Sequence, residues 1–350
     1  MQVSINVQKT DEVLRLECGN SERILLAGLR AGHNLPYECA TGTCGNCKAQ
    51  VIGGSVENLW PDAPGAKSFK SSNNEILMCQ SAAGDSCVLK IRSLSKSVLS
   101  PFKPKYISGF ITRAGLLTHD VQLIELKLNT HMDYLAGQFV IVELPGVDGY
   151  RAYSMIEHDQ GQDTLQLIIK NKSGGKFSSF VFDKDPTGTA VSIFGPLGSA
   201  TFERERDANR DLVCVAGGTG VAGLMAVISE ASFSGHFEKN KGVLCFGVRS
   251  ERDLFFLDRL KALVKQNSSQ LSVFLCLSES DASEELKNRY RQFNFFNGFV
   301  HECLSVIRLE TLNKPICFLA GPPVAVEAST GVLLRDYQVP VGSIRFDRFG

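Results

Sequence analysis

The sequence predicts three consecutive units: an α+β unit at the N-terminus, a small antiparallel β-barrel in the middle, and a doubly wound α/β unit at the C-terminus. Three observations support this fold class. Residues 1–95 combine short strand patterns and one helical stretch with a cysteine-rich loop. Residues 104–205 contain regularly spaced strands of period two, which is typical of a small barrel. From residue 206 to 350 strands and helices alternate, which indicates a parallel doubly wound sheet.

Length, charge and termini narrow the class of protein. A chain of 350 residues suits two or three domains. Lysine plus arginine equals aspartate plus glutamate, 37 each, and this balance argues against a nucleic-acid-binding protein. The chain opens directly on a strand pattern without a signal peptide, and it contains no apolar run long enough to span a membrane. We therefore expect a cytoplasmic protein.

Four cysteines have the spacing of ligands to a plant-type [2Fe–2S] cluster. Four residues separate the first two, two residues separate the second and third, and 31 residues separate the third and fourth. Three thiolates from one tight loop and a distant fourth cysteine close such a cluster. The predicted ligands are Cys39, Cys44, Cys47 and Cys79.

The composition of the cysteine loop favours the cluster over two alternatives. Gly42 and Gly45 let the backbone fold closely around the sulfurs, and loop N–H groups can then point at them. A structural zinc site usually uses two short cysteine pairs or Cys/His pairs, and the sequence has no second short pair. A disulfide framework would need an oxidising compartment. The other seven cysteines lie mostly in apolar runs and are interpreted as core residues.

Within the first unit the patterns predict two opening strands, a helix near Glu22–Ala31, and short strands around Cys47–Val51 and Val88–Ile91. The polar, proline-punctuated stretch 94–104 is the natural linker to the second unit. The strands predicted for the barrel are Tyr106–Thr112, Val121–Leu128, Gln138–Leu144, Leu165–Lys170 and Ala190–Phe194.

Two strings in the barrel carry side chains suited to a phosphate-bearing aromatic ligand. In the string from Arg151 to Ser154 an arginine can neutralise a phosphate, Tyr153 can lie on an aromatic ring, and a serine can hydrogen-bond a ring nitrogen or carbonyl. In the string 174–179, glycines precede hydroxyl residues at the start of a short helix that ends at Phe182, an arrangement suited to a pyrophosphate. Neither string is specific alone, but their order and spacing are.

In the third unit a buried strand, Asp211–Ala216, runs into the turn Gly217–Gly220 and a helix follows from Val221 towards Ala231. A glycine-rich turn between first strand and first helix lets a dinucleotide pyrophosphate approach the helix N-terminus, although this turn is not of the GxGxxG form. The further elements predicted are strands at Gly242–Val248, Leu271–Leu277 and Ile316–Leu319 and helices at Asp253–Lys265, Ser283–Gln292 and Pro323–Tyr337.

The segment after the second strand of this unit is where a nucleotide ribose would be read. It offers both signs of charge, Arg249 and Arg252 against Glu251 and Asp253. A carboxylate accepts hydrogen bonds from a free 2′-hydroxyl and repels a 2′-phosphate. Asp253 has an alternative role as the cap of the following helix, so Glu251 is the better candidate for the ribose, and we expect NADH to be preferred over NADPH.

Taken together, the cluster loop, the Arg-x-Tyr-Ser string, the Gly-Gly-Lys-Phe-Ser string and the Gly-Gly-Thr-Gly turn cover essentially the whole chain. In this order they resemble the ferredoxin–NADH reductase components of bacterial aromatic-ring oxygenases. The resemblance implies a β-grasp-like plant-type ferredoxin domain at residues 1–95, an FAD-binding barrel at 104–205 and an NAD-binding domain at 206–350. The string at residues 54–65 resembles most the reductases of carbazole-type dioxygenase systems.

The resemblance also implies cofactors, partners and site residues. NADH would pass electrons through FAD to the [2Fe–2S] cluster, and from there to a ferredoxin or a Rieske-type terminal oxygenase. The implied FAD-binding residues are Arg151, Tyr153, Ser154, Ile168, Lys170, Gly175, Lys176, Phe177, Ser178 and Ser179. The implied NAD-binding residues are Gly217, Gly218, Thr219, Gly220, Arg249, Glu251, Gly321, Pro322 and Pro323. No catalytic acid, base or nucleophile is expected, because the cofactors carry the redox chemistry.

Two features leave the interpretation open. Relatives commonly carry Cys-Gly-Pro-Pro where this chain has Ala320, so the geometry of hydride transfer would depend more on packing. The last residues include aromatic side chains that either cover the flavin or belong to the core. The alternative functions are a reductase of a di-iron monooxygenase, a reductase for deoxysugar synthesis, and a non-catalytic electron-transfer or sensor subunit.

Overall fold

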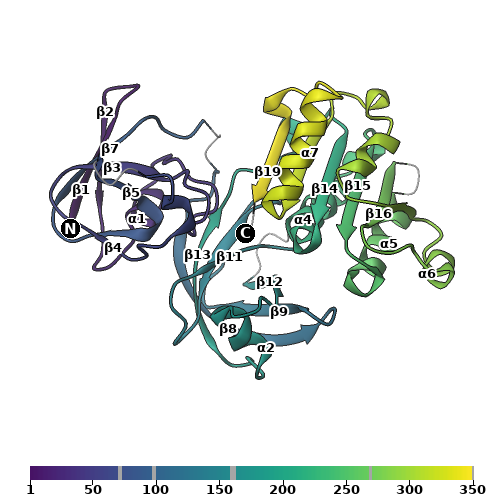
Figure 1. The fold of residues 1–350 in the computed structure, drawn as a ribbon, viewed down its shortest axis with the longest axis horizontal. Coiled ribbons are helices and arrows are strands. Elements are labelled where there is room, and N and C mark those ends of the chain that lie inside the picture. The colour runs from purple at the N-terminus through teal and green to yellow at the C-terminus, as the bar shows by residue number, and fades with distance from the viewer. Residues whose placement is uncertain (70–72, 97–99, 158–162, 268–269, 349–350) are drawn as a thin grey trace.

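The computed structural model describes residues 1–69, 73–96, 100–157, 163–267 and 270–348. Figure 1 shows three units: the N-terminal unit at the left, the antiparallel unit at the lower centre, and the parallel sheet with its helices at the right. The fold class expected from the sequence is confirmed, because an antiparallel six-stranded sheet and a parallel six-stranded sheet follow the N-terminal unit.

The N-terminal unit is a mixed five-stranded sheet in the order β2-β1-β7-β3-β5, with only β1 and β7 parallel. Helix α1 packs on it because its residues from Ile24 to Leu29 are all buried. A small second pair, β4 with β6, completes the unit. The elements are β1 (Gln2–Val7), β2 (Glu12–Glu17), α1 (Ile24–Arg30), β3 (Lys48–Gly53), β4 (Val56–Asn58), β5 (Glu75–Leu77), β6 (Ser81–Ala83) and β7 (Cys87–Ile91).

The middle unit is a six-stranded antiparallel sheet in the order β11-β10-β13-β8-β9-β12. The five strands expected from period-two patterns are all present, and β11 is an additional strand formed by the Arg-x-Tyr-Ser string itself. The elements are β8 (Lys105–Leu116), β9 (Val121–Leu128), β10 (Phe139–Glu143), β11 (Arg151–Ser154), β12 (Thr164–Lys170), α2 (Lys176–Phe182), β13 (Ala190–Leu197) and α3 (Arg204–Asp207).

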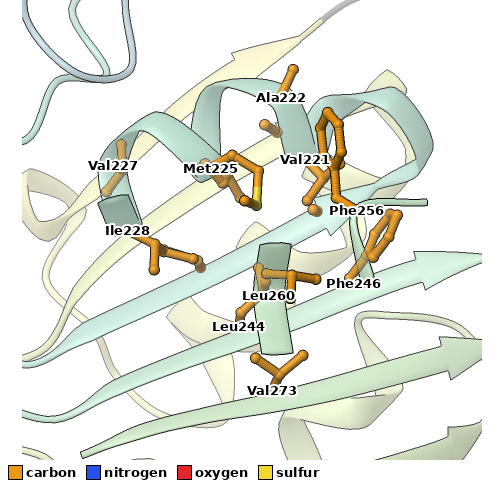
Figure 2. Packing of buried hydrophobic residues seen from close by; sticks show 14 of the residues in the cluster. Val221, Ala222, Met225, Val227, Ile228, Leu244, Phe246, Phe256, Leu260 and Val273 are labelled. Atoms are coloured by element: carbon orange, nitrogen blue, oxygen red, sulfur yellow. The ribbon is translucent and has the colours of Figure 1, made fainter. Parts of the chain in front are cut away.

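The C-terminal unit is a parallel sheet in the order β17-β16-β15-β14-β18-β19 with helices on both faces. In Figure 2, Met225 and Ile228 of α4 lie over Leu244 and Val273 of the strands, beside Leu260 of α5. The other face of the sheet packs against α7. The elements are β14 (Leu212–Gly217), α4 (Val221–Phe233), β15 (Gly242–Val248), α5 (Leu257–Gln266), β16 (Leu271–Leu277), α6 (Glu284–Arg289), β17 (Asn294–Asn297), β18 (Ile316–Gly321), α7 (Pro323–Arg335) and β19 (Ile344–Arg348).

The helix boundaries in this unit differ from those expected. Helix α5 begins at Leu257 rather than at Asp253, because residues 251–253 form a separate 3-10 turn closed by a capping box between Ser250 and Asp253. Phe256 then adopts a left-handed φ of 62°, which interrupts any continuous helix. The strands β17 and β19 were not expected.

The middle unit shares a hydrophobic core with each of its neighbours. Phe139 and Phe194 belong to the same buried cluster as the core of the N-terminal unit. Ile168 and Phe202 pack into the cluster beneath α4 of the C-terminal unit. Within the described parts of the chain, no helix is both long and apolar enough to cross a bilayer.

Candidate functional site

The four cysteines proposed as cluster ligands lie together at the side of the N-terminal unit that faces the middle unit. Cys39 Sγ lies 3.2 Å from Cys44 Sγ, and the thiol of Cys79 is hydrogen-bonded to that of Cys47. Cys44 is half-buried, whereas the other three are buried. The hydrogen bond shared by the two sulfurs lowers the pKa of Cys39 and raises the pKa of Cys44, because a single proton lies between them. A bound metal would replace the protons of these thiols.

The backbone of the loop fits an iron–sulfur cluster. The N–H groups of Thr41 and Cys44 each lie 3.4 Å from Cys39 Sγ, and the N–H of Asn46 lies 3.5 Å from Cys44 Sγ. Gly45 has a φ of +82°, and a Cβ on the facing Gly65 would lie 2.6 Å from the Gly45 nitrogen. N–H donors directed at sulfur and a close glycine contact are the features that a compact cluster needs.

An ion pair joins the cluster loop to the last strand of the C-terminal unit. Arg348 on β19 donates from Nε and Nη2 to the two carboxylate oxygens of Glu38, at 2.5 and 2.7 Å. Asn46 donates to the same carboxylate at 2.6 Å. The loop is therefore held by residues more than 300 positions apart in the sequence.

Beside this ion pair, burial, and secondly the charge of Glu38, raises the pKa of Asp347 to about 7. The neutral form stabilises the fold, so its contribution is complete below about pH 4 and is lost as the pH rises to about 7. We predict that Asp347→Asn, which keeps the neutral form at all pH values, raises the free energy of unfolding by about 4 kcal/mol at about pH 8. Urea unfolding of variant and parent at several pH values measures this. A difference that does not change with pH would contradict the assignment.

The flavin residues proposed on β11 lie between the cluster unit and helix α4. Tyr153 is half-buried and its ring centroid lies 5.3 Å from that of Phe177, so β11 and the start of α2 are in contact. Ser154 is buried, and a Cβ placed on Gly223 of α4 would lie 3.3 Å from its Oγ. Arg151 is exposed and donates from Nη1 to the Tyr150 carbonyl at 2.9 Å.

The other residues proposed for FAD are divided between open and occupied positions. Ser178 Oγ donates to the turn carbonyls of Lys172 and Gly175, so its hydroxyl shapes the turn. Ile168 and Phe177 are buried in the protein core. Those that lie at the surface of the turn are Gly175 and Lys176, and the Nζ of Lys176 pairs with Asp148 at 2.8 Å. Lys170 pairs with Asp120 at 3.1 Å.

A cavity of about 270 Å³ lies at the carboxyl ends of the central parallel strands. Of the residues proposed for NAD it brings together Gly217, Gly218, Thr219, Arg249 and Pro322. Its wall also includes Asp253, the less favoured candidate for the ribose, and residues that the sequence did not single out for the nucleotide: Asp120, Lys170, Ser278 and Gly298.

Gly220 and Gly321 do not line the cavity but support the turns that do. A Cβ on Gly220 would lie 2.4 Å from the backbone of Ala320, and Gly321 has a φ of +141° against Gly217. We predict that Gly220→Ala lowers the free energy of unfolding by about 1–3 kcal/mol, as overpacking does, and raises the KM for NADH. Gly342→Ala is the matched control, because its Cβ meets nothing within 4 Å. Equal stability and equal KM in the two variants would show that the contact is unimportant.

Glu251, which the sequence favours as the residue that binds the ribose, does not lie at the cavity. Its carboxylate accepts hydrogen bonds from the N–H and hydroxyl of Ser283, at the start of α6, and it does not line the cavity. Asp253 does line it, and it both caps its own turn and pairs with Arg249 at 3.0 Å. Asp253 does not cap the following helix, as the sequence suggested, because α5 begins after Phe256; it instead closes the capping box of the 3-10 turn and lies beside the cavity.

One carboxylate at the rim of the cavity, that of Asp120, comes from a different unit, so the sequence of the nucleotide unit alone could not reveal it. It lies in the turn before β9 of the middle unit and reaches Arg249 at 3.8 Å. Burial raises the pKa of Asp253, but the hydrogen bonds from Ser250 and Arg249 together lower it by more. The net effect is a pKa below the ordinary value for aspartate. The carboxylates of Asp120 and Asp253 thus neutralise Arg249 from two different units.

Three family models match consecutive parts of the chain. A 2Fe-2S iron-sulfur cluster binding domain matches residues 7–84, an oxidoreductase FAD-binding domain residues 109–202, and an oxidoreductase NAD-binding domain residues 214–330. Their order agrees with the order of the three units.

Similar full-length proteins share all three units. The chain is 32% identical, over 95% of its length and 96% of the relative, to ferredoxin–NAD(P)(+) reductase CarAd of Metapseudomonas resinovorans. It is 30% identical, over 95% of its length and 97% of the relative, to the ferredoxin–NAD(+) reductase component of the alkene monooxygenase system of Xanthobacter autotrophicus. The solved structure of a ferredoxin reductase in carbazole 1,9a-dioxygenase matches with a TM-score of 0.84 and 28% identity, over all of this chain and 98% of that one.

Proposed function

Because the chain belongs to the family of ferredoxin–NAD(P)(+) reductases, we propose that it supplies electrons to an aromatic-ring dioxygenase system, through a ferredoxin or directly to a Rieske-type terminal oxygenase. The chain is an NADH-dependent oxidoreductase with FAD and a [2Fe–2S] cluster as cofactors. The observation that carries the proposal is its full-length similarity to the ferredoxin reductase of a carbazole dioxygenase. We place it in the cytoplasm, whose reducing conditions suit four cysteines that bind a cluster and seven others that form no disulfide.

The three-unit order follows from the chemistry of the cofactors. When bound, FAD accepts the electron pair of a hydride and releases electrons singly, which suits a cluster that takes up one at a time. The chain's own residues bind and orient. We assign Arg151 to a flavin phosphate and Ser154 to the flavin ring, and the turn Gly217–Thr219 to the pyrophosphate of NADH.

A second candidate has its own support. The 30% identity to the reductase component of an alkene monooxygenase system is close to that of the first. A reductase of a monooxygenase would have the same cofactors and the same first steps. The two functions differ only in the protein that accepts the electrons.

Reconstitution separates the two functions. The purified holoprotein is combined with NADH and either a Rieske dioxygenase, with and without its ferredoxin, or the hydroxylase of a di-iron monooxygenase, and product is measured per NADH consumed. The proposal predicts coupled product formation with the Rieske system. Coupled turnover with the monooxygenase hydroxylase alone would establish the second candidate instead.

The rim of the nucleotide cavity predicts a preference for NADH. A 2′-phosphate near Arg249 would meet Asp120 and Asp253, and a like-charge contact of about 1–3 kcal/mol corresponds to a roughly ten- to hundredfold lower kcat/KM for NADPH. Asp120→Asn should reduce the ratio of kcat/KM for NADH to kcat/KM for NADPH, because Arg249 and Lys170 lose a counter-charge. Glu251→Gln is the matched control and should leave the ratio unchanged. A kcat/KM for NADPH that equals the value for NADH in the parent enzyme would refute this account of the rim.

A further inference from the structure

A buried tyrosine of the middle unit contacts the cluster unit at one of its proposed ligands. The hydroxyl of Tyr150 donates to the backbone carbonyl of Cys79 at 2.6 Å, and only 3% of the tyrosine is exposed. We propose that Tyr150 is a positioning residue that fixes the Cys79 peptide against the flavin strand and raises the reduction potential of the cluster. The inference rests on the proposed role of Cys79 as a cluster ligand.

The turn that contains Cys79 is held from two sides. It lies in a 3-10 turn, Met78–Gln80, whose first N–H donates to the carbonyl of Cys47 at 3.0 Å. Its own carbonyl accepts from Tyr150. Cys79 is fully buried, so these two bonds link one cluster ligand both to another ligand and to the neighbouring unit.

Tyr150 is equally well fixed on its own side. It directly precedes β11, whose first residue, Arg151, donates to the Tyr150 carbonyl at 2.9 Å. The guanidinium of Arg23 lies 4.0 Å from the centre of the Tyr150 ring and pairs with Glu143 at 3.2 Å. A single residue therefore connects the strand proposed to hold the flavin with the peptide of a cluster ligand, by covalent bonds on one side and one hydrogen bond on the other.

The hydroxyl has a defined electrostatic effect at this position. Hydrogen bonds and dipoles around an iron–sulfur cluster set its potential. The O–H dipole points its positive end at the Cys79 peptide and so stabilises the added negative charge of the reduced cluster. Without the hydroxyl the buried carbonyl has lost this donor, and the reduced cluster is less stable.

Tyr150→Phe tests the role, because it removes only the hydroxyl. We expect the equilibrium constant for reducing the cluster to fall about threefold, which equals about 28 mV at 59 mV per tenfold for one electron. The midpoint potential is measured on the holoprotein by redox titration with the cluster followed by electron paramagnetic resonance. Tyr106→Phe is the matched control, since Tyr106 is also a tyrosine of the middle unit that meets the N-terminal unit, but its partner there is Glu22 rather than a proposed cluster ligand. An unchanged potential in Tyr150→Phe, or an equal fall in Tyr106→Phe, would overturn the inference.

A second variant, expected to raise the reduction potential rather than lower it, keeps the inference testable if Tyr150→Phe does not take up its cluster. Incorporating 3-fluorotyrosine at position 150 makes the phenol a stronger donor and should raise the potential. A potential that stays constant or falls would contradict the role of Tyr150 and leave the proposed function intact. If the parent protein instead contained neither iron nor acid-labile sulfide, the proposed function itself would fail.

Discussion

Replacing Cys44 with serine should abolish electron delivery from NADH to cytochrome c while reduction of ferricyanide through the flavin largely survives. Cys44 is the least buried of the four proposed ligands, and its sulfur accepts the N–H of Asn46 at 3.5 Å. Serine preserves the size of the side chain but not the thiolate that binds iron. Steady-state assays with the two acceptors, at matched flavin content, measure the separation.

Cys87→Ala is the control for the loss of a cysteine in the same unit. Cys87 is buried in β7, and burial raises its pKa, so it behaves as a small apolar core residue. The Cys87→Ala protein should reduce both cytochrome c and ferricyanide at the rates of the parent. If Cys44→Ser lost both activities at full flavin occupancy, the order of transfer from flavin to cluster would be wrong.

Replacing Asp207 with asparagine should cause the largest loss of stability among the changes considered. Asp207 is fully buried, and Arg345 of β19 donates to both of its carboxylate oxygens at 2.8 Å. The backbone N–H of Glu203 adds a bond at 3.0 Å. Removing one partner of a buried ion pair leaves the other charge uncompensated, and this costs about 3–5 kcal/mol.

Urea unfolding of the holoprotein measures this loss. Glu284→Gln is the matched control, because its carboxylate is largely exposed and pairs with Lys287 at 2.9 Å on the surface. An exposed pair contributes at most about 1 kcal/mol. Equal unfolding free energies for the two variants would show that the ion pair between Asp207 of α3 and Arg345 of β19 does not stabilise the fold as its geometry indicates.

The sequence predicted most of the architecture because its signals are local. Strand patterns such as Gly242–Val248 and Leu271–Leu277 matched β15 and β16 residue for residue. The strands β17 and β19 were not predicted because they are short, carry polar residues and lie at the two edges of the sheet. Their formation depends on pairing with β16 and β18, which a local pattern does not show.

The site was predictable where spacing carries the chemistry and unpredictable where distant segments meet. The cysteine spacing alone selected four residues that the fold brings together. Asp120 and Tyr150 could not be selected, since each acts on a residue of another unit through tertiary contact. The sequence favours Glu251 over Asp253 for the ribose because Asp253 has an alternative role as a helix cap. The hydrogen bond from Ser283 that holds Glu251 outside the cavity is a tertiary contact, which the local sequence does not show.

Anaerobic reduction by NADH shows in which order the flavin and the cluster receive electrons. The purified holoprotein is mixed rapidly with NADH, flavin reduction is followed by absorbance, and the cluster by freeze-quench electron paramagnetic resonance. We expect the flavin to be reduced first and the cluster signal then to appear at a rate limited by transfer from the flavin. In Cys44→Ser the flavin step should remain and the cluster signal should be absent. Appearance of the cluster signal before flavin reduction, or in protein stripped of FAD, would contradict the route from NADH through FAD to the cluster.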